Sequence, residues 1–119
     1  MTPGARTPEL RRGFIHLARL DKLRPVLIIS PNVRNALASD AIVIPCSTTL
    51  SIAPTHVRVR KGEGGLSMPS VLKCEQITTL HQDDVRRAPL GGHLSPLRIL
   101  EVERAILRAI GVPVPLDPS

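Results

Sequence analysis

Three apolar segments of this sequence carry polar side chains that could hold a phosphate. Arg24 opens the first segment, three hydroxyl residues end the second (Ser47, Thr48 and Thr49), and the third contains Lys73, Glu75 and Gln76. A guanidinium binds phosphate through paired hydrogen bonds, hydroxyls bind its oxygens, and carboxylates and amides bind base edges. If the fold brings these groups together, we expect a small polar site able to grip or cut RNA.

The elements that must position these residues are mainly strands. Residues 25–29 and 41–46 are continuously apolar, which is typical of strands buried on both faces. Residues 55–60 alternate, with His56, Arg58 and Arg60 on the face opposite two valines, as in a strand with one wet face. Further strands are predicted at 12–20, 70–77 and 86–94, and a helical turn is predicted at 80–85.

The clearest predicted element is a C-terminal helix. Ser95 can cap its first turn, Pro96 suits its first position, and Gly111 follows its last periodic residue. One face is apolar at helical spacing, through Ile99, Val102, Ile106, Ala109 and Ile110. Such a face packs on a sheet or in a dimer interface.

These elements predict one small domain, a mainly β barrel with α additions. We expect a flexible N-terminal arm at residues 1–11, the folded domain at 12–111 and a proline-rich tail at 112–119. The first residues lack the apolar stretch of a secretory signal, and no apolar run approaches the roughly 18 residues that span a bilayer. The sequence therefore indicates a cytoplasmic protein without a membrane partner.

The composition favours a polyanionic partner and limits how bases could be read. The 119 residues carry a formal net charge of +6, and Phe14 is the single aromatic residue. A basic surface suits nucleic acid, although a basic protein without a specific partner has the same composition. Modules that stack single-stranded bases on aromatic rings are excluded, so base reading must use hydrogen bonds, arginine planes or shape.

Cysteine and histidine spacing predicts no metal site. Cys46 and Cys74 form no CxxC pair, and the four histidines are scattered without an HExxH motif. Structural zinc sites need closely paired ligands. We therefore expect both cysteines to be small buried residues of core strands in a reducing compartment.

Taken in order, the motifs of residues 12–111 resemble the MazF/PemK/Kid toxin family. The matching segments are Arg12-Gly13, the RPVLIIS run at 24–30, PCSTTL at 45–50, PTHV at 54–57, GEGGL at 62–66, CEQI at 74–77 and Leu94-Ser95-Pro96. The resemblance implies an SH3-like barrel of the CcdB/Kid/PemK type that works as a homodimer and needs no cofactor. It also implies a cognate antitoxin whose acidic, partly disordered segment blocks the RNA groove.

The activity that the resemblance implies is sequence-specific, metal-independent cleavage of single-stranded RNA. The 2′-hydroxyl of the substrate would be the nucleophile, leaving a 2′,3′-cyclic phosphate and a 5′-hydroxyl end. By position, Arg24 matches the catalytic arginine of the family, Ser47 its catalytic threonine, and Glu75 an acidic residue of the site, here expected as general base or base-edge acceptor. The other residues expected to bind RNA are Thr48, Thr49, His56, Arg58, Lys73, Gln76 and Thr78.

The sequence departs from the family pattern most clearly between its first two strands. Residues 21–23 replace a long loop that shapes the RNA groove in the family. Thr78 stands where an arginine is frequent, which removes one phosphate contact. The shortened loop leaves open a weakly active RNA-binding relic, and a second alternative is a non-catalytic toxin of the same fold that binds DNA gyrase.

Overall fold

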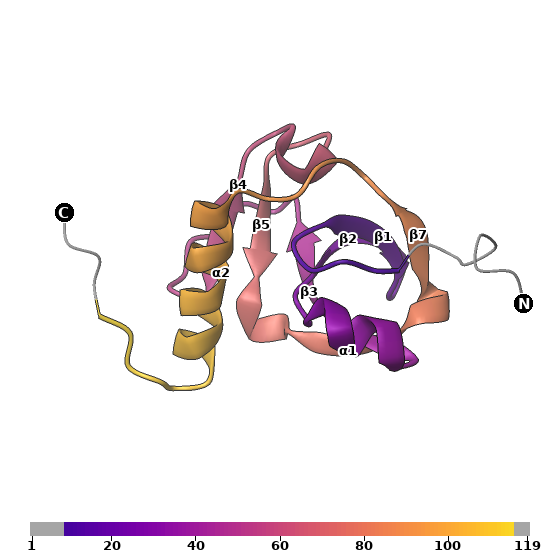
Figure 1. The fold of residues 1–119 in the computed structure, drawn as a ribbon. Coiled ribbons are helices and arrows are strands. Elements are labelled where there is room, and N and C mark those ends of the chain that lie inside the picture. The colour runs from indigo at the N-terminus through magenta and orange to yellow at the C-terminus, as the bar shows by residue number, and fades with distance from the viewer. Residues whose placement is uncertain (1–8, 116–119) are drawn as a thin grey trace, which may run out of the picture.

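The computed structural model describes residues 9–115, which form seven strands, two α-helices and three 3₁₀ turns (Figure 1). The strands are β1 (Ile15–Arg19), β2 (Leu23–Ile28), β3 (Asp40–Ser47), β4 (His56–Val59), β5 (Ser70–Lys73), β6 (Thr78–His81) and β7 (Val85–Pro89). The helices are α1 (Asn32–Leu37) and α2 (Pro96–Ala109), and the 3₁₀ turns are η2 (Glu63–Gly65), η3 (Cys74–Gln76) and η4 (Gln82–Asp84). The expected small β barrel with a C-terminal helix is confirmed.

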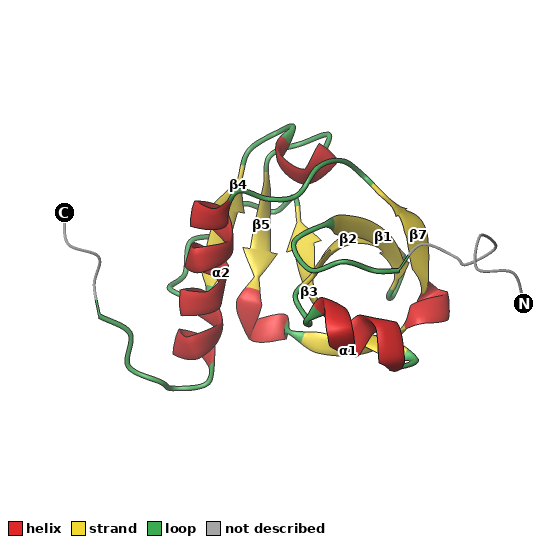
Figure 2. Ribbon diagram, viewed as in Figure 1, coloured by secondary structure: helices red, strands yellow, loops and turns green. Residues whose placement is uncertain are grey.

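β3 is the strand around which the sheet is organised. The strand order is β4-β5-β3-β2-β1-β7, all pairs being antiparallel, and β6 pairs with the first half of β3. Along one edge β3 therefore pairs with β6 through residues 40–43 and then with β5 through Cys46 and Ser47. Figure 2 shows the strands curling around the core, with α2 lying beside β4 and β5.

Two apolar clusters lie on opposite faces of the central strands. Leu27 and Ile29 belong to the cluster that α2 covers, whereas Val26 and Ile28 belong to the second cluster, with Leu10 and Val85. This alternation explains the continuous apolar run of β2, because each face of the strand meets a core. The predicted burial of this strand on both faces is confirmed. Leu10, within the arm expected at 1–11, is fully buried, while residues 1–8 of that arm lie outside the described range.

The prediction of one strand over residues 70–77 is wrong. β5 ends at Lys73, η3 follows, and the chain pairs again with β3 as β6. The turn is needed because β5 and β6 occupy different halves of the same β3 edge. The predicted helical turn at 80–85 shrinks to η4, since hydrogen bonding to β3 holds residues 78–81 as a strand.

Helix α2 begins as predicted and is buried along a narrower face than predicted. The Ser95 hydroxyl accepts a hydrogen bond from the Arg98 amide, and Pro96 follows the cap. Ile99, Val102 and Ala105 are buried, but Ile110 is 66% exposed. Of the apolar residues in the last turn, Ile106 packs against the core only in part and Leu107 is exposed. Within residues 9–115 no helix has the length and apolar character needed to cross a membrane.

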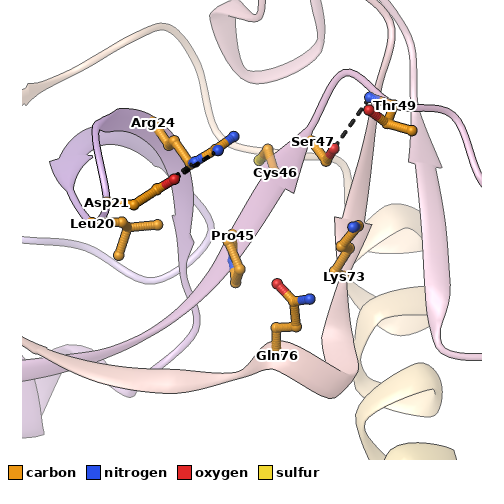
Figure 3. A pocket seen from close by; sticks show the side chains of 9 residues that line it. All are labelled: Leu20, Asp21, Arg24, Pro45, Cys46, Ser47, Thr49, Lys73 and Gln76. Carbon is orange, nitrogen blue, oxygen red and sulfur yellow. Dashed lines mark hydrogen bonds and ion pairs between the residues drawn. The ribbon is translucent and has the colours of Figure 1, made fainter.

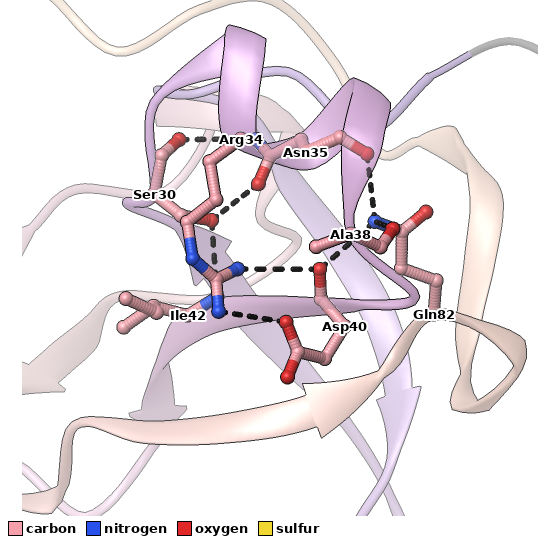
Figure 4. A network of polar contacts seen from close by, with 7 residues as sticks. All are labelled: Ser30, Arg34, Asn35, Ala38, Asp40, Ile42 and Gln82. Carbon is pink, nitrogen blue, oxygen red and sulfur yellow. Dashed lines mark hydrogen bonds and ion pairs between the residues drawn. The ribbon is translucent and has the colours of Figure 1, made fainter.

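A buried polar network holds α1 against the start of β3 (Figure 4). The Gln82 amide donates to the carbonyls of Asn35, Ala38 and Asp40. Asn35 donates to the Ser30 carbonyl, and the Ser30 hydroxyl accepts from the Ile42 amide. Because buried polar groups are costly when unpaired, these bonds fix the beginning of β3 in register. The opposite end of β3 carries Ser47.

Candidate functional site

A hollow of about 420 Å³ opens where β2 begins and where β3 and β5 end (Figure 3). Five of the residues singled out in the sequence line it: Arg24, Ser47, Thr49 from the loop after β3, Lys73 and Gln76. The remaining lining residues are Leu20, Asp21, Pro45 and Cys46. Two cations, two hydroxyls and one amide therefore meet at one place.

Strand register explains this convergence. Val26 of β2 pairs with Pro45 of β3, so extending the ladder by two residues puts Arg24 opposite Ser47. Cys46 pairs with Leu72 of β5, which puts Lys73 opposite Pro45. Gln76 comes from η3, whose turn directs its side chain toward the hollow (Figure 3).

Arg24 is held by Asp21, which lies in the short turn between β1 and β2. The Arg24 Nε donates to Asp21 Oδ1 at 2.8 Å, and Nη2 donates to Oδ2 at 3.0 Å. These hydrogen bonds hold the pKa of the Asp21 carboxyl well below its usual range and raise the pKa of Arg24. Both groups are therefore charged at neutral pH. The carboxylate occupies the edge of the guanidinium at which Nε and Nη2 donate in parallel.

The hydroxyls after β3 differ in where they lie. Ser47 Oγ accepts a hydrogen bond from the Thr49 amide at 3.1 Å, which orients the serine while leaving its hydroxyl proton for a ligand. Thr49 lines the hollow, whereas Thr48 is exposed and does not line it. Of the three consecutive hydroxyl residues, Ser47 and Thr49 line the hollow.

Glu75 lies outside this hollow, in a second polar cluster. Its Oε2 contacts His56 Nε2 at 3.1 Å, and its Oε1 accepts from the Thr55 hydroxyl at 3.0 Å. Ser51 Oγ contacts the other ring nitrogen of His56 at 3.1 Å. Burial opposes ionisation of Glu75, but bonds from its own amide, His56 and Thr55 outweigh burial and lower the pKa of the carboxyl. η3 thus sends Glu75 and Gln76 to different clusters.

The other expected RNA-binding residues lie further out. Arg58, in β4, lines two further hollows along that strand, and one of these is also lined by Ser51 and His56. Thr78 begins β6 and is exposed. Neither Arg58 nor Thr78 reaches the hollow of Arg24 in this structure.

Neither cysteine is a nucleophile at neutral pH. Cys46 and Cys74 are free and buried, and burial raises the pKa of each thiol to about 12. The expectation that both are small buried residues is confirmed, with Cys74 in η3 instead of a strand. Among the described residues, no three His, Cys, Asp or Glu side chains lie close enough together to hold a metal ion.

Asp21 and Leu20 are lining residues that the sequence analysis missed. The usable signal was the shortness of the turn: with two residues between Leu20 and Leu23, Asp21 must stay close to Arg24. Opposite charges three residues apart across such a turn can pair directly.

Comparison with known proteins finds relatives over most of the chain. The family described as "PemK-like, MazF-like toxin of type II toxin-antitoxin system" matches residues 11–110. The endoribonuclease MazF3 of Mycobacterium tuberculosis (strain CDC 1551 / Oshkosh) is 36% identical over 103 residues, covering 87% of this chain and 93% of the relative.

Solved structures agree with this relationship. The Mycobacterium tuberculosis toxin MazF-mt6 has a TM-score of 0.76 at 33% identity, covering 84% of this chain and 98% of that one. A mycobacterial endoribonuclease in complex with its cognate antitoxin has a TM-score of 0.78 at 27% identity, covering 89% and 99%. The similarities confirm the predicted type of barrel.

Proposed function

Because the chain belongs to the PemK-like, MazF-like toxins of type II toxin-antitoxin systems, we propose that it is an endoribonuclease acting on single-stranded RNA. The observation that carries this proposal is the meeting of the Arg24 guanidinium, the Ser47 hydroxyl and the Lys73 ammonium at one hollow. Fixed cations and a hydroxyl donor are what a phosphodiester needs when it gains charge during cleavage.

The proposed reaction is attack by the 2′-hydroxyl of the substrate on the adjacent phosphorus. The 2′-oxygen–phosphorus bond forms, the phosphorus–5′-oxygen bond breaks, the 5′-oxygen takes up a proton from solvent, and the products are a 2′,3′-cyclic phosphate and a 5′-hydroxyl end. Arg24 and Lys73 offset the charge of the pentacoordinate phosphorus, and Ser47 donates to a phosphate oxygen. Since the nucleophile belongs to the RNA and the cations to the protein, the reaction proceeds without a metal.

The 2′-hydroxyl proton needs an acceptor, and two carboxylates are near. Glu75 was one expectation, as general base or as base-edge acceptor. Its bonds to Thr55 and His56 favour the second role, on the β4 side of the site. Asp21 is the one carboxylate among the described residues lining the hollow, so we assign it the proton once phosphate has replaced it at Arg24.

Sequence specificity would come from side chains around the scissile phosphate. Gln76 presents an amide at the hollow, and Glu75 presents an ionised carboxylate beyond it. Amides and carboxylates pair with base edges, which suits a protein whose single aromatic residue leaves no stacking platform.

The proposed assembly is a homodimer whose groove a cognate antitoxin blocks. Apolar side chains are exposed on α2, where Leu97 is 69% exposed, and at its C-cap, where Ile110 is 66% exposed, and a second copy would cover them. A net charge of +6 suits an acidic antitoxin segment, and one structural relative is an endoribonuclease in complex with its cognate antitoxin. We place this activity in the cytoplasm, where RNA is available.

The deciding experiment incubates a long single-stranded RNA in EDTA with the wild-type protein, Arg24→Ala or Arg24→Lys. We expect discrete cuts with 5′-hydroxyl and 2′,3′-cyclic phosphate ends from the wild type, and loss of cutting in Arg24→Ala. Arg24→Lys keeps the charge but not the paired donors and should recover part of the rate.

Other outcomes would reassign the protein. RNA left intact, with cleaved DNA accumulating in the presence of gyrase, would favour the gyrase-binding alternative. RNA bound with steep salt dependence but never cut would favour the RNA-binding relic.

A further inference from the structure

A second hollow, of about 370 Å³, lies at the end of β4 near the first turn of α2. Four cations from separate segments line it: Arg58 in β4, Arg60 and Lys61 directly after β4, and Arg98 in α2. Leu50 and Ser70 also contribute to its wall. No role at this hollow follows from the cleavage chemistry at Arg24.

Three of these four cations are available to a ligand. Arg98 contacts Glu63 at 3.1 Å and Glu101 at 3.1 Å, so carboxylates already neutralise it. Within residues 9–115, Arg58, Arg60 and Lys61 make no ion pair, and all three are exposed. Glu63 also accepts a hydrogen bond from the Arg60 backbone amide, so the turn that presents these cations is fixed on Arg98.

The second hollow follows on from the first along the sheet. Val71 of β5 pairs with Ser47 on one side and with Arg58 on the other, so the three residues form one row across adjacent strands. Residues in such a row share a face, and two strand spacings separate Ser47 from Arg58 by about 10 Å. The loop after β3 also joins the hollows, since Thr49 lines the first and Leu50 the second.

We propose that the hollow formed by Arg58, Arg60 and Lys61 is a second phosphate subsite, which holds the backbone of the RNA strand whose scissile phosphate lies at Arg24. This inference rests on the proposed function. Phosphate contacts of this kind raise affinity without reading sequence. β4 is an edge strand, and positive charges on an edge strand also prevent it from pairing with a strand of another molecule. The experiment must therefore distinguish a loss of RNA binding from a loss of solubility.

The test compares Arg60→Gln/Lys61→Gln with the matched control Arg11→Gln/Arg19→Gln. Both double variants lose two exposed positive charges, and the control residues lie before and at the end of β1. The probes are a 2′-O-methyl dinucleotide, whose single phosphate can occupy only one hollow, and a 2′-O-methyl oligonucleotide of about 16 nucleotides; both can bind but have no 2′-hydroxyl to react. Affinity is measured against salt concentration, and thermal unfolding checks that each variant is folded.

The slope measured is that of the logarithm of RNA affinity against the logarithm of salt concentration. We expect Arg60→Gln/Lys61→Gln to reduce the steepness of this slope for the longer probe by about 1.4, or about 0.7 for each of two lost phosphate contacts. The slope for the short probe, and the cleavage rate at saturating RNA, should stay at the wild-type values. The control should keep the wild-type slope with both probes.

Equal slopes in the two double variants would overturn the subsite. The subsite would also be overturned if Arg60→Gln/Lys61→Gln kept the wild-type slope for RNA but lost binding of an acidic oligoglutamate peptide. The hollow would then serve a protein partner. Absence of RNA cleavage by the wild type would contradict the proposed function alone, since the uncleavable probes still measure the subsite.

Discussion

The Asp21 carboxylate binds Arg24 through two hydrogen bonds, of 2.8 and 3.0 Å, inside the hollow where a phosphate would lie. A carboxylate and a phosphate satisfy the same guanidinium donors, so RNA must compete with Asp21 for Arg24. The short turn between β1 and β2 therefore supplies a group that acts on the site, although it lacks the long loop of the resembled family.

Asp21→Asn should bind an uncleavable 2′-O-methyl oligonucleotide more tightly. The substitution removes a negative charge that competes for Arg24, and a screened surface pair of this kind corresponds to about a two- to fivefold change in affinity. Fluorescence anisotropy measures the dissociation constant, with Asp83→Asn as a control for net charge. Unchanged or weaker binding by Asp21→Asn would contradict the competition.

The same variant should cut RNA more slowly at saturating protein, by about 10²-fold or more if Asp21 accepts the 2′-hydroxyl proton. Single-turnover rates measure this step apart from binding. Tighter binding together with an unchanged rate would leave Asp21 as a competitor only, and would assign the proton to another group.

Ser47→Ala should lower the cleavage rate by about 10²- to 10³-fold, the loss typical of one preorganised donor to a charge-gaining oxygen. Ser47→Thr keeps the hydroxyl and should retain most of the rate. Thr48→Ala is the matched control, because Thr48 lies next in sequence but is exposed and outside the hollow. A large loss of cleavage rate in Thr48→Ala, with no loss of rate in Ser47→Ala, would mean that the loop rearranges on binding RNA.

Glu75→Gln should raise KM several-fold and change kcat little. The substitution keeps the size of the side chain but removes the charge that holds His56 and Thr55, which connect η3 to the loop after β3. Steady-state cleavage of a short RNA separates the two parameters. If kcat instead falls about 10²-fold while KM is unchanged, Glu75 takes part in proton transfer and the general-base expectation holds.

His16 should make folding stability fall as the pH drops below about 6.5. Burial lowers the pKa of His16, and the hydrogen bond from Nδ1 to the Arg86 carbonyl only partly opposes this. The unfolded chain therefore takes up a proton below the ordinary pKa of 6.5 that the folded state does not take up, and stability falls as pH falls. Urea unfolding of His16→Phe should show a smaller loss of stability over the same fall in pH; an equal loss would show that His16 is not the source of the effect.

Local patterns in the sequence predicted most of the strands, the C-terminal helix and the polar groups of the candidate site. The apolar run at residues 25–29 indicated the buried strand β2, and Ser95 and Pro96 indicated the start of α2, because each of these signals lies in neighbouring residues. The motif order from Arg12-Gly13 to Ser95-Pro96 was likewise sufficient for the family.

The tertiary structure decided which of these groups meet. Arg24, Ser47 and Lys73 converge because the register of β2, β3 and β5 aligns residues far apart in sequence. Glu75 and Gln76 diverge because β3 pairs with two strands along one edge, which forces η3 into what reads as a continuous strand. A single-residue change of register would reverse every facing side chain, and register depends on pairing between distant segments. For this reason the sequence supplied the reactive groups, whereas the sheet selected Ser47 over Thr48 and placed Glu75 and Gln76 in different clusters.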